Sequence, residues 1–181
     1  AGYATPSVVE HVFALLLALQ RRLAEQQHAA HSLWAHQRGF CVLDYPTAEL
    51  HGKTLGIVGY GELGRAVAAV GTAFGMRMLI AQRPGGDDRA GRVPLEELLR
   101  AADVVSLHCP LTNTTRGLIG ARELMLMKPI ALLINTARGG IVDDSALLHA
   151  LQHGHLGGAG VDVLAEEPPP HGNPLLAHKR P

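Results

Sequence analysis

From Leu50 onward, short apolar runs alternate with amphipathic segments, and this alternation limits the possible folds more than any other feature of the chain. Helices are predicted between the apolar runs, at residues 62–74, 94–99, 121–127 and 144–153. Buried strands are predicted by the runs themselves, at residues 53–58, 77–81, 103–108, 130–135 and 158–163. Strands joined by helices form a parallel sheet with right-handed crossovers. The sequence therefore predicts an α/β fold with a Rossmann-type doubly wound parallel sheet.

A long helix is predicted before this alternation, from Thr5 or Ser7 to about Gln27. Ser7 and Glu10 have the spacing of a capping box. The helix is apolar on nearly all sides, which fits either a core helix or a subunit interface. The sequence leaves both readings open. We therefore divide the chain into a helix and linker at residues 1–49 and a Rossmann core at residues 50–181.

Composition excludes several classes of function. The chain has 181 residues, a formal net charge of +0 and 47% hydrophobic residues, which suits one globular domain. Neutral charge argues against nucleic acid and membrane surfaces as partners. The apolar run from Val12 to Leu19 is too short to span a bilayer. With only two cysteines, Cys41 and Cys109, we expect a reducing, cytoplasmic location.

A glycine-rich motif, Gly59-Tyr60-Gly61-Glu62-Leu63-Gly64, follows the first predicted strand and opens a helix. In such a motif Gly59 permits the tight turn, Gly61 lets backbone reach a pyrophosphate, and Gly64 lets helix and strand pack closely. The phosphates would lie at the positive end of the helix. This context predicts a dinucleotide site. A methyltransferase, which also uses a glycine-rich first loop, is the alternative.

The end of the second predicted strand bears on the choice of cofactor. An acidic residue there holds the ribose of NAD, but this chain has Gln82 followed by Arg83. A guanidinium at this place can meet a 2′-phosphate, so NADP(H) is favoured, with NAD(H) still possible. Asp87 and Asp88 come later and are less well placed. Arg83 as a solvated loop residue is the alternative.

Arg138 follows the fourth predicted strand, where the chain enters a loop. Ligands of open α/β sheets bind at this carboxyl edge, and an arginine can grip a carboxylate with two parallel hydrogen bonds. This indicates a small organic acid as substrate. His28, His31 and His36 lie close together in sequence but lack supporting Cys, Asp or Glu ligands, so we predict no metal site.

Three motifs in order resemble the D-isomer-specific 2-hydroxyacid dehydrogenase family. They are Leu107-His108-Cys109-Pro110-Leu111-Thr112, the segment from Asn135 to Asp143, and Gly160-Val161-Asp162-Val163 running to Glu166-Glu167-Pro168. The resemblance covers nearly the whole chain. Within the family, the segment from Phe40 to Tyr45 is similar to bacterial glycerate dehydrogenases, also called hydroxypyruvate reductases.

The resemblance implies roles for individual residues along the cofactor. Glu62 and Leu63 would contribute to the phosphate turn, and Gln82 and Arg83 would face the adenosine ribose. Asp162 would accept a hydrogen bond from the nicotinamide carboxamide. The residues expected to line the remainder of the cofactor are Cys109, Pro110, Thr115, Thr136, Ala137 and Arg138. For Cys109, a redox thiol is the alternative to a small apolar lining group.

The resemblance also implies catalytic roles. Arg138 would bind the substrate carboxylate and keto oxygen, and Glu167 would be the acidic partner of a catalytic histidine. A solvated loop carboxylate is the alternative for Glu167. His171 and His178 do not match the family's position for that histidine. We therefore expect the chain to be part of a longer protein, without the substrate domain and inactive alone.

The expected parent protein is an NAD(P)-dependent reductase of hydroxypyruvate or glyoxylate that forms a D-2-hydroxy acid. Because its N-terminal helix is so apolar, we expect the protein to form a homodimer through that helix region. A second hypothesis is a cofactor-responsive oligomeric scaffold of the same fold without catalysis. Arg138 and Glu167 favour the enzyme, because a pure scaffold needs neither of them.

Overall fold

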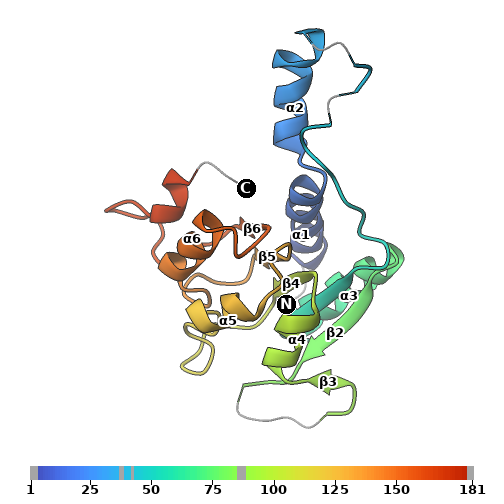
Figure 1. Cartoon of the computed structure of the whole chain (residues 1–181). Helices are drawn as coiled ribbons and strands as arrows, with labels where there is room; N and C mark the ends of the chain where they lie inside the picture. Colours follow the sequence, from blue (N-terminus) through green and yellow to red (C-terminus); the bar gives the residue numbers. More distant parts are fainter. Residues whose placement is uncertain (1–3, 37–38, 42, 85–88, 179–181) are drawn as a thin grey trace.

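The computed structural model describes residues 4–36, 39–41, 43–84 and 89–178, and a parallel six-stranded sheet forms its centre (Figure 1). The sheet has the order β3-β2-β1-β4-β5-β6. The first three strands are added in one direction from β1 and the last three in the opposite direction, so the strand order switches between β1 and β4. This confirms the predicted doubly wound fold. The strands are β1 (Thr54–Val58), β2 (Arg77–Ala81), β3 (Arg92–Val93), β4 (Val104–Leu107), β5 (Leu132–Asn135) and β6 (Gly158–Val161).

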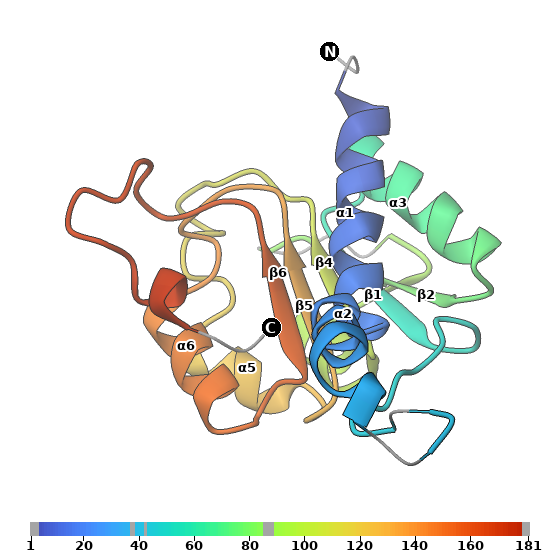
Figure 2. The ribbon, with the colours of Figure 1, turned by 90° about the horizontal axis from the view of Figure 1, so that it is seen from above.

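Helices cover both faces of the sheet (Figure 2). One face carries α1 and α3, and the other carries α4, α5 and α6. The α-helices are α1 (Thr5–Gln20), α2 (Leu23–Ser32), α3 (Glu62–Ala73), α4 (Leu95–Ala101), α5 (Ala121–Leu126) and α6 (Asp144–Gln152). Two short 3-10 helices, η1 and η2, span Trp34–His36 and Pro174–Ala177.

Alternate residues of the central strands supply the two halves of the core. On β5, Ile134 packs toward α1 and α3, whereas Leu133 packs toward the opposite layer. On β4, Val104 and Val105 divide in the same way. A strand buried on both faces needs an apolar residue at every position. The continuous apolar runs of the sequence follow from this three-layer arrangement.

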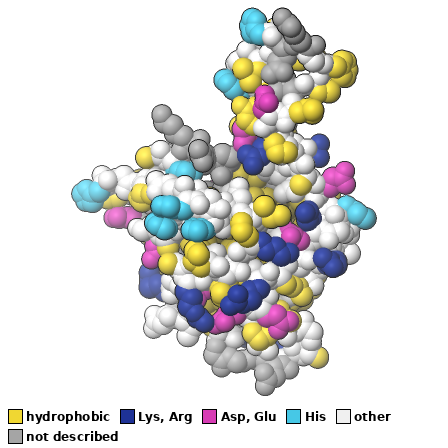
Figure 3. Space-filling view, in the orientation of Figure 1, with side chains coloured by type: hydrophobic (Ala, Val, Ile, Leu, Met, Phe, Trp, Pro, Cys, Tyr) yellow, Lys and Arg dark blue, Asp and Glu magenta, His cyan; other side chains and the backbone are white. Residues whose placement is uncertain are grey.

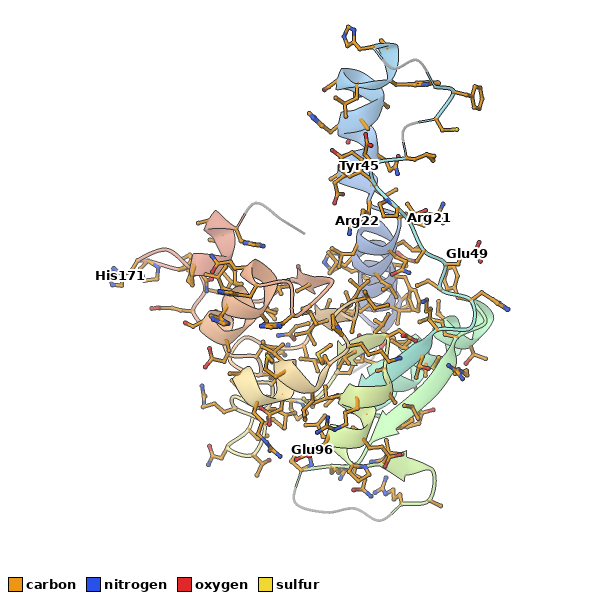
Figure 4. All side chains as sticks on the ribbon, viewed as in Figure 1. Arg21, Arg22, Tyr45, Glu49, Glu96 and His171 are labelled. Carbon is orange, nitrogen blue, oxygen red and sulfur yellow. The ribbon has the colours of Figure 1, made fainter. Side chains whose placement is uncertain are left out.

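The predicted single helix from Thr5 or Ser7 to Gln27 is wrong. The structure has two helices, because α1 ends at Gln20 and Arg22 adopts a left-handed backbone conformation with φ of 49°. The returning chain contributes to this break, since the amide of Ala48 donates to the carbonyl of Gln20 at 3.3 Å. After Arg22 the chain restarts as α2 in a new direction. Figure 4 shows Arg22 and Tyr45 at this junction.

The predicted capping box is also wrong. The first residue of α1 is Thr5, its N-cap is Ala4, and no side chain caps the helix. Pro6 instead lies in the first turn of α1. A proline is well tolerated there because its missing amide would have no partner within the helix. Ser7 and Glu10 therefore lie inside α1 rather than at its boundary.

The apolar residues of α1 belong mainly to the core. Val9, Val12, Phe13 and Leu16 are buried between α1, α3 and the sheet. Of the two interpretations that the sequence leaves open for this helix, the structure favours the core helix. Within the described residues, no helix is long and apolar enough to cross a membrane.

Beyond α1, the chain forms an arm that projects from the body of the molecule (Figure 1). We define the arm as α2 with the described residues 33–36, 39–41 and 43–45. Hydrophobic side chains are visible on its surface in Figure 3. The exposed fractions of the large ones are 54% for Leu23, 54% for Trp34, 90% for Phe40 and 82% for Leu43. The exposed apolar surface of this N-terminal region thus lies on the arm.

Candidate functional site

A cavity of about 410 Å³ lies at the carboxyl edge of the sheet, where the loops after β1, β2 and β4 meet. Each of these loops follows a buried parallel strand, so the sheet order brings them together. Seven of the predicted cofactor-binding residues line this cavity: Gly59, Gly61, Gln82, Arg83, Cys109, Pro110 and Thr115. The cavity therefore collects residues that lie more than 50 positions apart in the sequence.

The turn after β1 has the geometry that its glycines predict. Gly59 has φ of +97°, and a β-carbon there would lie 2.5 Å from the carbonyl carbon of His108. A β-carbon on Gly64 would overlap the carbonyl oxygen of Gly59, so this glycine allows α3 to pack on the turn. Gly61 differs, because nothing lies within 4 Å of its β-carbon position. Open space above Gly61 leaves room for a bound group.

The first turn of α3 contains the predicted residues Glu62 and Leu63. Leu63 is partly buried, and the carboxylate of Glu62 accepts a hydrogen bond from the hydroxyl of Thr5 at 2.8 Å. This contact joins the start of α1 to the start of α3. The backbone amides at the N-terminus of α3 carry the positive end of a 12-residue helix toward the turn.

Two arginines line the end of the cavity at β2. Arg83 follows β2, and Arg92 lies on β3. The two-residue strand β3 is held beside β2 by a hydrogen bond from the amide of Gln82 to the carbonyl of Val93 at 2.8 Å. No carboxylate is among the described residues that line this cavity. Asp87 and Asp88 lie outside the described residues.

The end of β4 brings His108 and Cys109 to the cavity. Burial lowers the pKa of His108 to about 4, so its imidazole is neutral at pH 7. Its Nε2 atom lies 2.8 Å from the hydroxyl of Ser106. Burial raises the pKa of the Cys109 thiol, which keeps it protonated. A protonated, buried thiol fits the lining role of Cys109 better than the redox role.

Thr115 fixes the loop that follows β4. Its hydroxyl donates to the carbonyl of Pro110 at 2.6 Å and accepts from the amide of Thr112 at 2.7 Å. The residue is buried, with 4% of its surface exposed. Thr115 thus contributes to the shape of the cavity wall as well as lining it.

Arg138 lies in the loop after β5, and a buried residue before it shapes this loop. Asn135 accepts a hydrogen bond from the amide of Ala137 and donates one to the carbonyl of Arg138, both at 3.2 Å. The exposed Arg138 guanidinium donates to the carbonyl of Ala137 at 2.6 Å. Sequence reasoning missed Asn135 as a functional residue. The sequence feature that could have identified it is a polar residue at the end of an apolar run that predicts a buried strand.

Thr136 belongs to the same loop and has a buried hydroxyl. Among the described residues, this oxygen has no hydrogen-bond partner. A buried polar atom without a partner carries a desolvation cost, which a ligand that bonds to it can remove. Thr136 is therefore suited to contact a polar group of a ligand near Arg138.

The loops of Arg138 and Glu167 touch each other. A β-carbon on Gly139 would overlap the backbone carbonyl of Leu164, so only a glycine allows this approach. The amide of Leu164 donates to the carboxylate of Glu167 at 2.6 Å. The structure therefore brings the segments of the two predicted catalytic residues together, although they lie 29 positions apart in the sequence.

Asp162 follows β6 at the same edge of the sheet. Its amide donates to the carbonyl of Asn135 at 3.0 Å, which extends the pairing of β5 and β6. Its carboxylate oxygen Oδ1 lies 3.2 Å from Nε2 of His11 on α1. No motif or spacing in the sequence pairs these two residues.

The two histidines near the end of the chain lie in different surroundings. His171 is exposed, and Figure 4 shows it at the tip of a loop that points away from the body. His178 lines a separate cavity of about 180 Å³ with Leu147 and Leu164, and its Nε2 atom is buried without a partner among the described residues. His171 is thus at the exposed tip of the loop that also carries Glu167. Within the described part of the chain, no three or more His, Cys, Asp or Glu side chains form a metal-binding group.

The glycine turn and the Arg138 loop lie at one edge of the sheet. They follow β1 and β5, which are both parallel neighbours of β4. Two strand spacings separate β1 from β5, which is about 10 Å. A single extended ligand can therefore contact both loops. This relationship is the one on which the sequence interpretation depends.

Comparison with known proteins agrees with this geometry. Residues 13–181 match the domain described as "D-isomer specific 2-hydroxyacid dehydrogenase, NAD binding domain". A glycerate dehydrogenase of Methylorubrum extorquens is 47% identical over 175 residues, which are 96% of this chain and 55% of that protein. A glyoxylate reductase of Aeropyrum pernix is 42% identical over 98% of this chain and 55% of its own length.

Solved structures give the same result. A D-lactate dehydrogenase of Aquifex aeolicus, complexed with NAD and lactic acid, has a TM-score of 0.80 and 39% identity over 92% of this chain and 50% of that one. An acyclic imino acid reductase in complex with NADPH and D-Arg has a TM-score of 0.83 and 32% identity over 97% of this chain and 55% of its own. The chain spans about half the length of the relatives it matches.

Proposed function

Because the chain belongs to the D-isomer-specific 2-hydroxyacid dehydrogenase family, we propose that residues 1–181 form the dinucleotide-binding domain of an NAD(P)-dependent oxidoreductase of D-2-hydroxy acids. One observation carries this proposal. The glycine turn, the cavity beside it and the Arg138 loop lie at the same edge of one parallel sheet. This arrangement suits a ligand with phosphates at one end and a reacting acid at the other.

The residues at this edge fit a dinucleotide. The pyrophosphate would lie over Gly61, where the structure leaves open space, and at the N-terminus of α3. The remaining predicted contacts follow the edge in order. Gln82 and Arg83 would face the adenosine ribose, and Cys109, Pro110 and Thr115 would line the middle of the cofactor. Thr136, Ala137 and Asp162 would meet the nicotinamide end, where the buried Thr136 hydroxyl needs a partner.

Hydride chemistry would come from the nicotinamide, which exchanges a hydride with the 2-carbon of the acid. Arg138 would bind the carboxylate of a 2-keto acid and stabilise negative charge on its keto oxygen during reduction. Glu167 would hold the histidine that supplies the proton to that oxygen. The touching loops of Arg138 and Glu167 support a shared role for these two residues.

We favour NADP(H) as the cofactor, with NAD(H) as the alternative. Arg83 and Arg92 line the adenosine end of the cavity, where a 2′-phosphate would lie. A guanidinium group forms strong charge-assisted hydrogen bonds with phosphate oxygens. Gln82 occupies the place at which an acidic residue would bind the ribose hydroxyls of NAD and repel a phosphate.

Hydroxypyruvate or glyoxylate is the proposed substrate of the whole protein, in keeping with the similarity to glycerate dehydrogenases and glyoxylate reductases. Two free cysteines, exposed Cys41 and buried Cys109, are compatible with a reducing cytoplasmic location. Residues 1–181 contain the cofactor side of the site. We therefore expect cofactor binding by this chain and little or no turnover.

Titration of the chain with NADH and NADPH, followed by the fluorescence of the reduced nicotinamide, tests cofactor binding. The substitution Gly61→Val fills the open space over the turn and should weaken binding at least about tenfold, because a side chain there would displace the pyrophosphate. Ala69→Val adds similar bulk to an exposed position of α3 and should leave binding unchanged. Failure of the unaltered chain to bind either nucleotide would refute the proposal.

We also propose a homodimer that forms through the N-terminal helix region. The arm carries the exposed side chains of Leu23, Trp34 and Phe40, and an exposed apolar patch of this kind commonly marks a protein interface. Sedimentation velocity should show a dimer that Trp34→Glu converts to a monomer. Leu176→Glu, at an equally apolar exposed position on η2, should leave the dimer intact. A monomeric unaltered chain would contradict this proposal.

A further inference from the structure

We infer that His11 is a positioning residue for Asp162, which it holds so that one carboxylate oxygen remains directed to the nicotinamide carboxamide. This inference rests on the proposed function. Nε2 of His11 lies 3.2 Å from Oδ1 of Asp162, and the two side chains are 45% and 51% exposed. The pair therefore lies at the surface of the sheet edge, where a ligand can reach it.

Packing between α1 and β6 fixes this pair in register. Leu15 lies one helical turn after His11, and Gly160 lies two strand positions before Asp162. A β-carbon on Gly160 would lie 3.0 Å from the β-carbon of Leu15, so α1 rests closely on the strand at this point. Four residues of helix rise about 6 Å, and two residues of strand span about 6.6 Å. Contact of Leu15 with Gly160 thus aligns His11 with Asp162.

Both ends of the pair are anchored elsewhere. The amide of Asp162 donates to the carbonyl of Asn135, so its backbone is held by β5. The N-terminal end of α1 is tied to α3 by the bond from Thr5 to Glu62. With both backbones fixed, only the side-chain torsions of Asp162 remain free, and the contact with His11 determines them.

The chemistry of the carboxylate explains why this orientation matters. A carboxylate has two oxygens and can accept several hydrogen bonds. When Nε2 of His11 donates to Oδ1, the second oxygen stays available for an N–H group of the carboxamide. An exposed pair of this kind contributes little to stability. Its larger effect is expected on the binding of the nicotinamide half of the cofactor.

The test compares two ligands that differ in that half. Calorimetric titration of the full chain with NADH and with ADP-ribose, which lacks nicotinamide, separates the two ends of the site. His11→Ala should weaken NADH about fivefold, the effect of one oriented hydrogen bond, and should leave ADP-ribose within about twofold. His11→Gln keeps an N–H donor and should recover most of the affinity. His171→Ala, at the exposed loop tip that points away from the body, is the matched control.

A double substitution completes the test. In an Asp162→Ala background, His11→Ala should cause no further loss of NADH affinity, because its partner is already absent. Equal losses for NADH and ADP-ribose, no loss for NADH, or additive losses in the double variant would each overturn the inference. If the unaltered chain binds neither NADH nor NADPH, the proposed function fails together with this inference. If it binds NADH and ADP-ribose and His11→Ala changes neither affinity, this inference fails alone.

Discussion

The backbones of Gly59 and Cys109 approach so closely that no side chain fits between them. A β-carbon on Gly59 would lie 2.5 Å from the amide nitrogen of Cys109, and the φ of +97° at Gly59 is itself unfavourable for any other residue. The close contact between the turn after β1 and the end of β4 therefore requires a residue without a side chain at position 59. Both segments line the candidate cofactor cavity.

Substituting Gly59 with alanine should lower the stability of the protein. We expect a loss of about 2–4 kcal/mol in the free energy of unfolding, because strain and overlap act together at this position. Urea denaturation measures this loss. Gly61→Ala is the matched control, since nothing lies within 4 Å of its β-carbon position and its φ is −81°. A tolerated alanine at position 59 would show that the two segments can separate freely.

Arg83→Ala should weaken NADPH more than NADH. Arg83 lines the end of the cavity at β2, where the adenosine would lie, and of the two nucleotides only NADPH carries a 2′-phosphate there. We expect a loss of about tenfold for NADPH and less than about threefold for NADH, measured by fluorescence titration. Arg100→Ala, at an exposed position of α4, should change neither affinity. Equal losses for the two nucleotides would remove the argument for phosphate recognition.

The stability of the protein should fall in acid partly because of His108. Burial lowers its pKa to about 4, so between pH 6.5 and pH 4 the unfolded chain binds a proton that the folded chain does not. Its contribution is complete above about pH 6.5 and is lost as the pH falls through about 4. Urea unfolding at pH 7 and at pH 4 measures how much free energy of unfolding each protein loses in acid. The unaltered protein should lose about 1–3 kcal/mol more than His108→Gln.

A second acid-sensitive group titrates in a lower pH range, which keeps the effects separate. Burial alone would raise the pKa of Asp103, but hydrogen bonds from Lys128 at 2.8 Å and from the amide of Thr54 at 2.8 Å, with the nearby charges of Lys128 and Lys53, lower it overall. Its contribution is therefore lost only below about pH 4. If His108→Gln and the unaltered protein lost the same free energy of unfolding between pH 6.5 and pH 4, burial of the His108 imidazole would not be the cause of that loss.

Asn135→Ala should loosen the Arg138 loop. The buried side chain makes one hydrogen bond to Ala137 and one to Arg138, so its removal should cost about 1–3 kcal/mol and leave backbone groups without partners. Hydrogen exchange of the amides at positions 136–140 should become faster. Asn135→Asp keeps the acceptor for Ala137 and should have a smaller effect. Unchanged exchange in the alanine variant would show that other contacts hold the loop.

Local patterns predicted most of the fold because both faces of the sheet are covered. Runs such as Leu132–Asn135 are apolar at nearly every position, and α3, α5 and α6 each end near a glycine or a proline. The sequence pattern did not predict features that depend on contacts between distant parts of the chain or on very short elements. The break at Arg22 depends on the returning chain at Ala48, and β3 is too short, at two residues, to produce a periodic signal.

Residues of the candidate site could be predicted where a backbone conformation or a type of contact favours one residue type. Gly59 is recognisable because a positive φ favours glycine, and Arg138 is a candidate because a guanidinium suits the proposed contact with a carboxylate. The contact of His11 with Asp162 gave no signal, because its partners lie 151 positions apart and on different elements. Asn135 was missed for another reason, since an asparagine at a strand end is ordinary until its two bonds to the following loop are seen.

The order of the strands also sets a scale for what the edge of the sheet can hold. From β2, which ends at the arginine-lined side, to β5, which precedes Arg138, there are three strand intervals, or about 14 Å. A ligand that contacts both sides at once must therefore span at least this distance, as the proposed dinucleotide would with its two nucleotides joined end to end.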